Sequence, residues 1–271
     1  MDYKLPKRVE NSNKSTFGKV LNIAGSDYMT GAAYLSSVAA LKVGCGYCFL
    51  CSTERVINIV ATQSQNIVFV PLHKLKYYLK DADVIEIGCG LSQQDNAVKI
   101  FEEFIDGTDS HQKIIVDADA LNIISKDSQK FLSKNFDNII FTPHPKEAAR
   151  LLGVNLERIL SDIKSSAKEI TKKYNCITVL KTHNTYIYSP DGRDYTNNTG
   201  NNSLAKAGSG DVLTGIIAGL CAQNMDMFEG ACLGVYLHGL CADLAKEKLT
   251  EYSVMADDLI SFIPNAIKLL N

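Results

Sequence analysis

Residues 207–217 read AGSGDVLTGII, a turn of small residues that runs into an apolar helix. Small residues let the backbone approach a ligand closely, and the start of a helix presents unpaired N–H groups and the positive end of the helix dipole. Such a site suits phosphate oxygens that gain charge during transfer. Asp211 fits the start of the helix and could take a proton from an attacking hydroxyl. An equally weighted alternative is that Ser209 or Asp211 is only an N-cap and the glycines form only a tight turn.

On either side of this turn, short apolar runs alternate with longer amphipathic ones. We expect strands at residues 20–24, 47–51, 83–87, 114–116, 139–141, 178–180, 185–188 and 193–196. We expect helices at residues 31–43, 55–60, 96–105, 146–152, 156–174, 211–222, 228–248 and 257–270, with Pro264 kinking or restarting the last. This alternation predicts an α/β fold, with a mostly parallel central sheet flanked by helices on both faces. Because no Ser/Gly/Pro-rich linker divides the chain, we expect residues 1–271 to form a single domain.

The unusual loops lie where the predicted strands end, which is where such sheets bind ligands. Gly88-Cys89-Gly90 allows a ligand to approach the backbone, but it lacks the third glycine of a dinucleotide fingerprint. His144 is held between two prolines and could bond a substrate or shuttle a proton, although a lone loop histidine is more often a surface residue. Residues 181–185, KTHNT, could reach nucleotide phosphates or an adenine edge, or could simply close a hairpin.

Three further polar groups have two interpretations each. Glu147 either compensates the dipole of a helix or lies near a nucleotide-bound cation. Asp117 and Asp119 follow a strand as a possible carboxylate pair, but we favour the start of a helix for them. Residues 197–203, NNTGNNS, could bond a substrate, although many ordinary loops have this composition.

Composition excludes several classes of protein. The 271 residues contain 28 basic and 30 acidic side chains, so the net charge of −2 argues against nucleic-acid binding. No apolar stretch is long enough to span a bilayer, and no export signal begins the chain, so we expect no membrane association and a cytoplasmic location.

The spacing of Cys45, Cys48 and Cys51 suits a metal or redox site, yet no second cluster matches it, and we favour buried packing in a strand. Classical P-loop, H-E-x-x-H and Ser/His/Asp patterns are absent from the sequence.

Taken in order, the motifs resemble the ADP- or ATP-dependent NAD(P)H-hydrate dehydratases, which have the ribokinase-like fold. The matching stretches span roughly residues 18–265. They are Gly25-Ser26-Asp27 to Gly31-Ala32-Ala33, Ile87-Gly88-Cys89-Gly90-Leu91, Val116-Asp117-Ala118-Asp119-Ala120-Leu121-Asn122, Thr142-Pro143-His144-Pro145-Lys146-Glu147, Val179-Leu180-Lys181, Thr199-Gly200-Asn201, Gly208-Ser209-Gly210-Asp211-Val212-Leu213, His238-Gly239 and Ala256-Asp257-Asp258-Leu259-Ile260.

The resemblance implies a lyase that repairs hydrated nicotinamide cofactors, either NADH hydrate or NADPH hydrate, with Mg²⁺ and ADP or ATP. The nucleotide would phosphorylate the ring hydroxyl, and elimination of phosphate would restore the double bond. Asp211 would be the catalytic base. The substrate-binding positions would be Ala32, Gly90, His144 and Asp211, and the nucleotide-binding positions would be Lys181, Thr182, His183, Asn184, Thr185 and Gly210. No residue would ligate a metal directly, although Glu147 falls where related kinases hold magnesium through water.

This sequence also departs from the pattern of the family. Cys89 and Asn202 stand where the family usually has proline, Ser203-Leu204 where it usually has Gly-Met, and Lys206-Ala207 where it usually has Thr-Gly. Some members carry an N-terminal epimerase domain, and we expect that domain to be absent here. The family tends to assemble, so we expect a homo-oligomer. Two alternatives remain: a kinase of a small alcohol such as a vitamin precursor, and a nucleotide-binding protein without catalysis.

Overall fold

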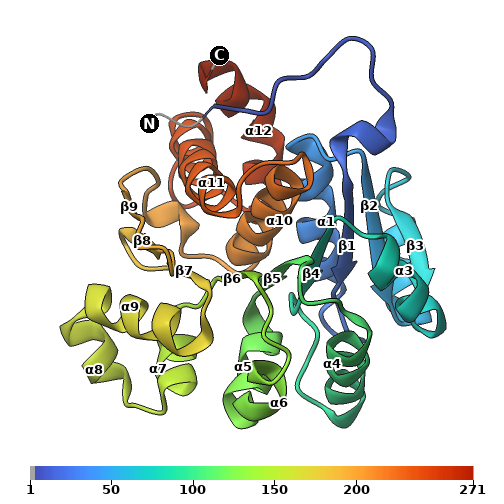
Figure 1. Cartoon of the computed structure of the whole chain (residues 1–271). Coiled ribbons are helices and arrows are strands. Elements are labelled where there is room, and N and C mark those ends of the chain that lie inside the picture. The colour runs from blue at the N-terminus through green and yellow to red at the C-terminus, as the bar shows by residue number, and fades with distance from the viewer. Residues whose placement is uncertain (1–3, 271) are drawn as a thin grey trace.

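A single nine-stranded sheet organises residues 4–270, the part of the chain that the computed structural model describes (Figure 1). The strands run in the order β3-β2-β1-β4-β5-β6-β7-β8-β9. Strands β1 to β7 pair in parallel, whereas β8 and β9 add an antiparallel edge. Their bounds are β1 Lys19–Ile23, β2 Tyr47–Ser52, β3 Val68–Pro71, β4 Val84–Ile87, β5 Lys113–Val116, β6 Asn138–Phe141, β7 Ile177–Leu180, β8 Thr185–Tyr188 and β9 Asp194–Asn197. The predicted α/β class and mostly parallel sheet are confirmed.

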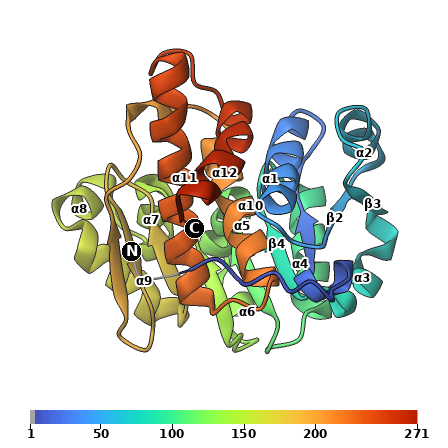
Figure 2. The same cartoon turned by 90° about the horizontal axis from the view of Figure 1, so that it is seen from above.

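Helices cover both faces of this sheet, as predicted. Helices α1, α10 and α11 pack on one face, and α3, α4, α5, α7 and α9 lie on the other (Figure 1). Helix α2 packs beside β3 at one edge, and α8 lies toward the opposite end of the sheet (Figure 2). The bounds are α1 Thr30–Lys42, α2 Glu54–Ala61, α3 Leu75–Asp81, α4 Asp95–Gly107, α5 Ala118–Lys126, α6 Ser128–Leu132, α7 Pro145–Leu152, α8 Leu156–Ser161, α9 Ile163–Tyr174, α10 Ser209–Ala222, α11 Met227–Leu249 and α12 Ala256–Leu270, with short 3-10 turns at Lys14–Phe17, Leu72–Lys74 and Asn202–Leu204.

The direction in which the chain adds strands reverses between β1 and β4. From β1 the chain builds outward to β2 and β3, and from β4 it builds the other way to β9. At such a switch point the loops leave the sheet on opposite sides and open a crevice beyond the carboxyl ends of the strands. Two backbone bonds hold the loops together here, Gly25 N to Cys89 O at 2.8 Å and Gly88 N to Ile23 O at 3.2 Å. The fold therefore places the Gly88-Cys89-Gly90 loop at this crevice.

Two predictions about helices were wrong, and a third was wrong in one of its two alternatives. Residues 156–174 form α8 and α9 instead of one helix, because Asp162 leaves helical geometry (φ −150°, ψ 83°) and its side chain accepts a hydrogen bond from Ser165 N. Helix α12 does not restart at Pro264, so that alternative was wrong, whereas the predicted kink stays a prediction. Pro264 is exposed while Ile260 and Ile263 are buried, so packing of the apolar side holds the helix together across the proline. Helix α10 begins at Ser209 and not at Asp211, so it is two residues longer than expected.

Strand β3 and helices α3 and α6 are not predicted by the sequence patterns. Each is short, and β3 is an edge strand that ends in Pro71, a residue that lacks a backbone donor. The cysteines pack as favoured: all eight are free and buried. Cys48 and Cys51 lie in the cores on opposite faces of the sheet, so their side chains diverge. No helix within residues 4–270 is long and apolar enough to cross a membrane.

Candidate active site

The first turn of α10 has backbone amides that no side chain caps. Gly208 occupies the N-cap position with φ 89°, a left-handed conformation that favours glycine, and it makes no side-chain hydrogen bond. Ser209 and Asp211 are therefore not N-caps, because they lie inside the first turn. The amides and the helix dipole are available to an anion.

A buried ion pair lies beside this helix start. Lys181 Nζ is 2.8 Å from Asp117 Oδ1, and Thr214 Oγ1 donates to Asp117 Oδ2 at 2.7 Å. A Cβ placed on Gly210 would lie 3.5 Å from Lys181 Nζ, so the ammonium group adjoins the α10 amides. Burial lowers the pKa of Lys181, but the charges of Asp117 and Glu147 raise it above its ordinary value. The pair thus keeps a positive charge next to the anion site.

Asp117 was considered from the sequence as one of a carboxylate pair, but it was given a structural role and not counted among the site residues. It caps α5, since Oδ1 also accepts from Ala118 N at 2.8 Å, which is the structural role favoured above. The same carboxylate also holds Lys181. Its position at the end of a central strand was the available signal, but the partner lies 64 residues away in the sequence.

His144 and Glu147 form a capping box at the start of α7. His144 Nδ1 accepts from Lys146 N and Glu147 N, while Glu147 Oε2 accepts from His144 N at 2.8 Å. Since Nδ1 accepts these bonds, the proton of the neutral ring is on Nε2. Burial and the charge of Lys181 lower the pKa of His144, and burial raises the pKa of Glu147 to about 7. His144 is thus a neutral ring fixed at the edge of the cavity.

The Asp211 carboxyl lies between the anion site and the switch-point crevice. Burial and the charge of Asp117 raise its pKa to about 6, so near neutral pH it is a carboxylate able to accept a proton. On the crevice side, a Cβ placed on Gly90 would lie 2.7 Å from Ala32 Cβ, which shows that these two positions meet. In the same loop, the buried Cys89 thiol donates to Glu86 Oε1 across 3.6 Å.

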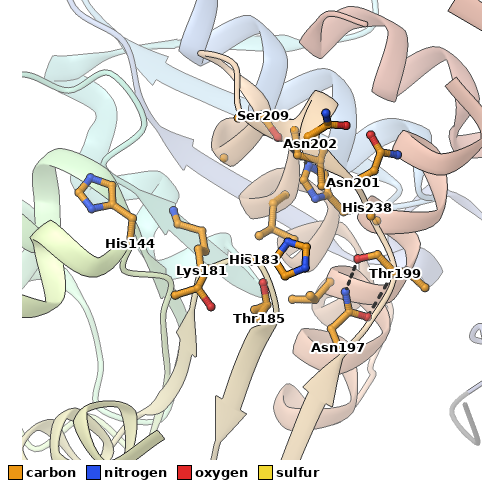
Figure 3. A pocket seen from close by; sticks show the side chains of 18 of the residues that line it. His144, Lys181, His183, Thr185, Asn197, Thr199, Asn201, Asn202, Ser209 and His238 are labelled. Atoms are coloured by element: carbon orange, nitrogen blue, oxygen red, sulfur yellow. Dashed lines mark hydrogen bonds between the residues drawn. The ribbon is translucent and has the colours of Figure 1, made fainter. Parts of the chain in front are cut away.

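A cavity of about 510 Å³ opens between the β7–β8 hairpin, the loop after β9 and the start of α10. His144 and Lys181 lie on one side, and Ser209, Asn201, Asn202 and His238 lie opposite (Figure 3). Of the predicted nucleotide-binding residues, Lys181, Thr182, His183, Thr185 and Gly210 line the cavity. Asn184 does not; its carbonyl accepts the Thr182 hydroxyl within the hairpin loop. Ala32, Gly90 and Asp211 lie outside this lining, on the crevice side.

Helix α11 fixes the polar loop that forms the far wall. Asp243 accepts from Gly200 N at 3.0 Å and from Asn201 Nδ2 at 2.9 Å, and Thr199 Oγ1 donates to Tyr236 O at 2.9 Å. Sequence reasoning left this loop undecided, because its composition alone does not separate a wall of a cavity from an ordinary turn. Nearby, Ser209 Oγ is 3.2 Å from Nε2 of His238, whose pKa burial lowers to about 4.

A model of the NAD(P)H-hydrate dehydratase family matches residues 20–265. The chain belongs to the NAD(P)H-hydrate dehydratase family. An ADP-dependent (S)-NAD(P)H-hydrate dehydratase of Neisseria meningitidis is 38% identical over 89% of this chain and 81% of its own length. A bifunctional NAD(P)H-hydrate repair enzyme of Moorella thermoacetica is 36% identical over 97% of this chain.

A solved structure of the Bacillus subtilis ADP/ATP-dependent NAD(P)H-hydrate dehydratase, co-crystallized with ATP/Mg²⁺, superimposes with a TM-score of 0.85 and 31% identity. It covers 99% of this chain and 95% of its own. The chain spans about half the length of the bifunctional repair enzymes that it matches, 52% in the Moorella case. The family and the ribokinase-like fold indicated by the motifs are both confirmed.

Proposed function

We propose that this chain uses ADP or ATP to dehydrate (S)-NADH hydrate or (S)-NADPH hydrate, a hydro-lyase reaction that repairs the cofactor. One observation supports this above the others: the buried Asp211 carboxylate lies in the uncapped first turn of α10, where Asp117 and Lys181 are close enough to shift its pKa. A base and an anion site thus share one turn of helix. The Neisseria and Bacillus relatives, which are named as dehydratases, support the same activity.

In this proposal Asp211 removes the proton of the ring hydroxyl. The hydroxyl oxygen attacks the terminal phosphorus of the nucleotide at the same time. The bond between the terminal phosphorus and the bridging oxygen of the nucleotide breaks, so ADP leaves as AMP and ATP leaves as ADP. Phosphate then leaves the ring with its electron pair, and loss of a proton from the adjacent carbon restores the double bond. The amides at Gly210 and the ammonium of Lys181 stabilise the charge on the phosphoryl oxygens.

The nucleotide would occupy the cavity, whose volume is in the range of small-molecule sites. The hairpin residues Lys181, Thr182, His183 and Thr185 would contact it, and Asn184 would hold the hairpin loop. His144, which lines the edge of the cavity, would contact the hydrate there. These assignments follow from which walls of the cavity and crevice the side chains occupy.

Mg²⁺ fits this site as a companion of the nucleotide. No three His, Cys, Asp or Glu side chains within residues 4–270 form a metal cluster, and Mg²⁺ usually relies on phosphates, waters and one or two carboxylates. Glu147 is buried beside Lys181 and its pKa is raised, so it is a carboxylate that a hydrated cation would stabilise. When bound, the ion would supply positive charge to the transferring phosphate.

The test measures recovery of the reduced-nicotinamide absorbance. Protein is mixed with NADH hydrate or NADPH hydrate, Mg²⁺ and either ADP or ATP, beside Asp211→Asn. We expect recovery that requires nucleotide and releases phosphate, and a loss of at least about a hundredfold in the variant. A stable phosphorylated product would instead favour the kinase of a small alcohol. Nucleotide binding that is indifferent to Asp211 and yields no product would favour a binding protein.

We also infer a cytoplasmic homo-oligomer. The eight free, buried cysteines suit a reducing compartment. Large apolar side chains are exposed at Tyr252, Met255 and Leu269 on and beside α12, where a second copy could cover them. Light scattering of the purified protein tests this assembly, and a monomer at micromolar concentration would contradict it.

A further inference from the structure

His238 and Gly239 are neighbours on α11 to which the proposed reaction gives no role. A Cβ placed on Gly239 would lie 2.6 Å from the backbone oxygen of Thr199, so only glycine lets α11 pack this closely against the loop after β9. The same stretch of α11 brings the His238 ring to the cavity, where the residue is only 6% exposed. The pair therefore belongs to the wall of the candidate active site.

The His238 ring contacts one side chain of α10. Its Nε2 atom lies 3.2 Å from Ser209 Oγ, and both residues line the cavity on the side opposite Lys181 (Figure 3). Ser209 is buried and is the first residue of α10, so it precedes Gly210 in the uncapped turn. Among the residues that the structure describes, His238 is the one hydrogen-bond partner of the Ser209 hydroxyl. The contact thus lies where the cavity meets the anion site.

The two side chains can direct a proton into the cavity. A serine hydroxyl has one proton to donate and can accept at the same time, whereas a phosphoryl oxygen of a nucleotide only accepts. A hydroxyl that bonds such an oxygen must therefore accept, and not donate, in its bond to the ring. Burial lowers the pKa of His238 to about 4, so the ring is neutral near pH 7 and carries one proton.

The second ring nitrogen leaves this proton available to Nε2. No hydrogen bond or ion pair involves Nδ1 of His238 in the described part of the chain, so no contact there holds the proton on Nδ1. A proton on Nε2 is then donated to Ser209 Oγ. The Ser209 proton remains free to bond a ligand in the cavity.

We propose that Ser209 binds a phosphoryl oxygen of the nucleotide and that His238 positions it, by donating the Nε2 proton to Ser209 Oγ so that the serine proton is directed at the anion. The presence of a nucleotide in this cavity rests on the proposed function. Ser209 adds a side-chain donor to the α10 amides and the Lys181 ammonium group. Because its acceptor is an anion, the bond is charge-assisted and belongs to the stronger class of hydrogen bonds.

The binding test measures the dissociation constants of ADP with Mg²⁺ and of adenosine by titration calorimetry. Ser209→Ala should raise the constant for ADP about tenfold to thirtyfold, because one hydrogen bond to a charged group is lost. The constant for adenosine, which has no phosphate, should change less than about twofold. Ser166→Ala is the matched control: Ser166 is a buried serine of α9 that donates to Asp162 O at 2.8 Å and does not line the cavity. It should leave both constants unchanged.

Variants of His238 separate positioning from packing. His238→Phe keeps an aromatic ring without a donor and should raise the dissociation constant of ADP about threefold to tenfold. In a protein that already carries Ser209→Ala, the same change should have little further effect. His238→Gln keeps an N–H donor and should return the constant toward that of the wild type. An equal effect of His238→Phe in both backgrounds would overturn the positioning role, because the ring would then act by packing alone.

Nitrogen-15 NMR of the histidine rings locates the proton without any turnover. The signals of His238 are those missing from His238→Gln. In the complex with ADP we expect a protonated Nε2 and a bare Nδ1. A proton on Nδ1 in that complex would overturn the proposal, because Ser209 would then donate to the ring. Failure of the wild type to bind ADP would overturn the proposed function together with this inference, whereas ADP binding that Ser209→Ala leaves unchanged overturns this inference alone.

Discussion

At the scale of single residues, the ionised Asp211 carboxyl lowers the free energy of unfolding of the chain near neutral pH. Its pKa is about 6 in the folded chain, above the ordinary value of 3.8, so the folded state favours the protonated form. Stability from this group is therefore fully present below about pH 4 and is lost as pH rises through 6. Asp211→Asn should be more stable than the wild type by about 1 to 3 kcal/mol at pH 8 and equal to it near pH 4. Urea unfolding at both pH values measures this.

The comparison of the two pH values is the internal control, because an effect of amide packing would appear at both. A variant that is less stable at pH 8 would show that the surroundings of Asp211 do not destabilise its ionised form.

The sequence pointed to Asp211 itself, since a carboxylate after AGSG is a local pattern. It did not show that Asp117 pairs with Lys181, because that partner is set by the order of strands in the sheet.

At the scale of elements, α11 acts as the support of the loop after β9. Asp243→Ala removes both bonds to Gly200 and Asn201, so the wall of the cavity loosens. We expect KM for the nucleotide to rise about fivefold to twentyfold, since one or two bonds of about 1 kcal/mol hold the wall in its binding shape. The value of kcat should change less, because Asp211 lies outside this loop.

Glu247→Ala is the matched control, an exposed acidic residue four positions further along α11. Equal changes in KM for both variants would mean that the loss of a negative charge changes KM, and that the bonds from Asp243 to Gly200 and Asn201 do not.

The helices and strands themselves were largely predictable. Helices α10 and α11 follow from their long, continuous apolar content, whereas the break at Asp162 depends on a cap that competes with a continuous amphipathic pattern.

At the scale of the whole molecule, the site joins segments that are distant in sequence. The alternation of strands and helices predicted a parallel sheet and placed the loops at one edge. It could not give the reversal between β1 and β4, because strand order is decided by packing and not by local pattern. That reversal makes the crevice where Ala32 meets Gly90, next to Asp211. The family resemblance supplied residues of this crevice that spacing alone did not select.

A ligand that bridges these segments should stabilise the entire fold. Nucleotide at a hundred times its dissociation constant adds about 2.7 kcal/mol to the free energy of unfolding, which for a chain of this size raises Tm by roughly 5 to 10 °C.

Lys181→Met should abolish most of this gain. It also leaves Asp117 buried without its partner, which costs about 3 to 5 kcal/mol of stability by itself. The double variant Asp117→Asn/Lys181→Met removes both charges, so it should recover much of that stability while still failing to respond to ADP. Calorimetry with and without ADP separates the two effects. A double variant that regains the full ADP response would show that the ammonium group takes no part in binding phosphate, and that the amides of α10 suffice.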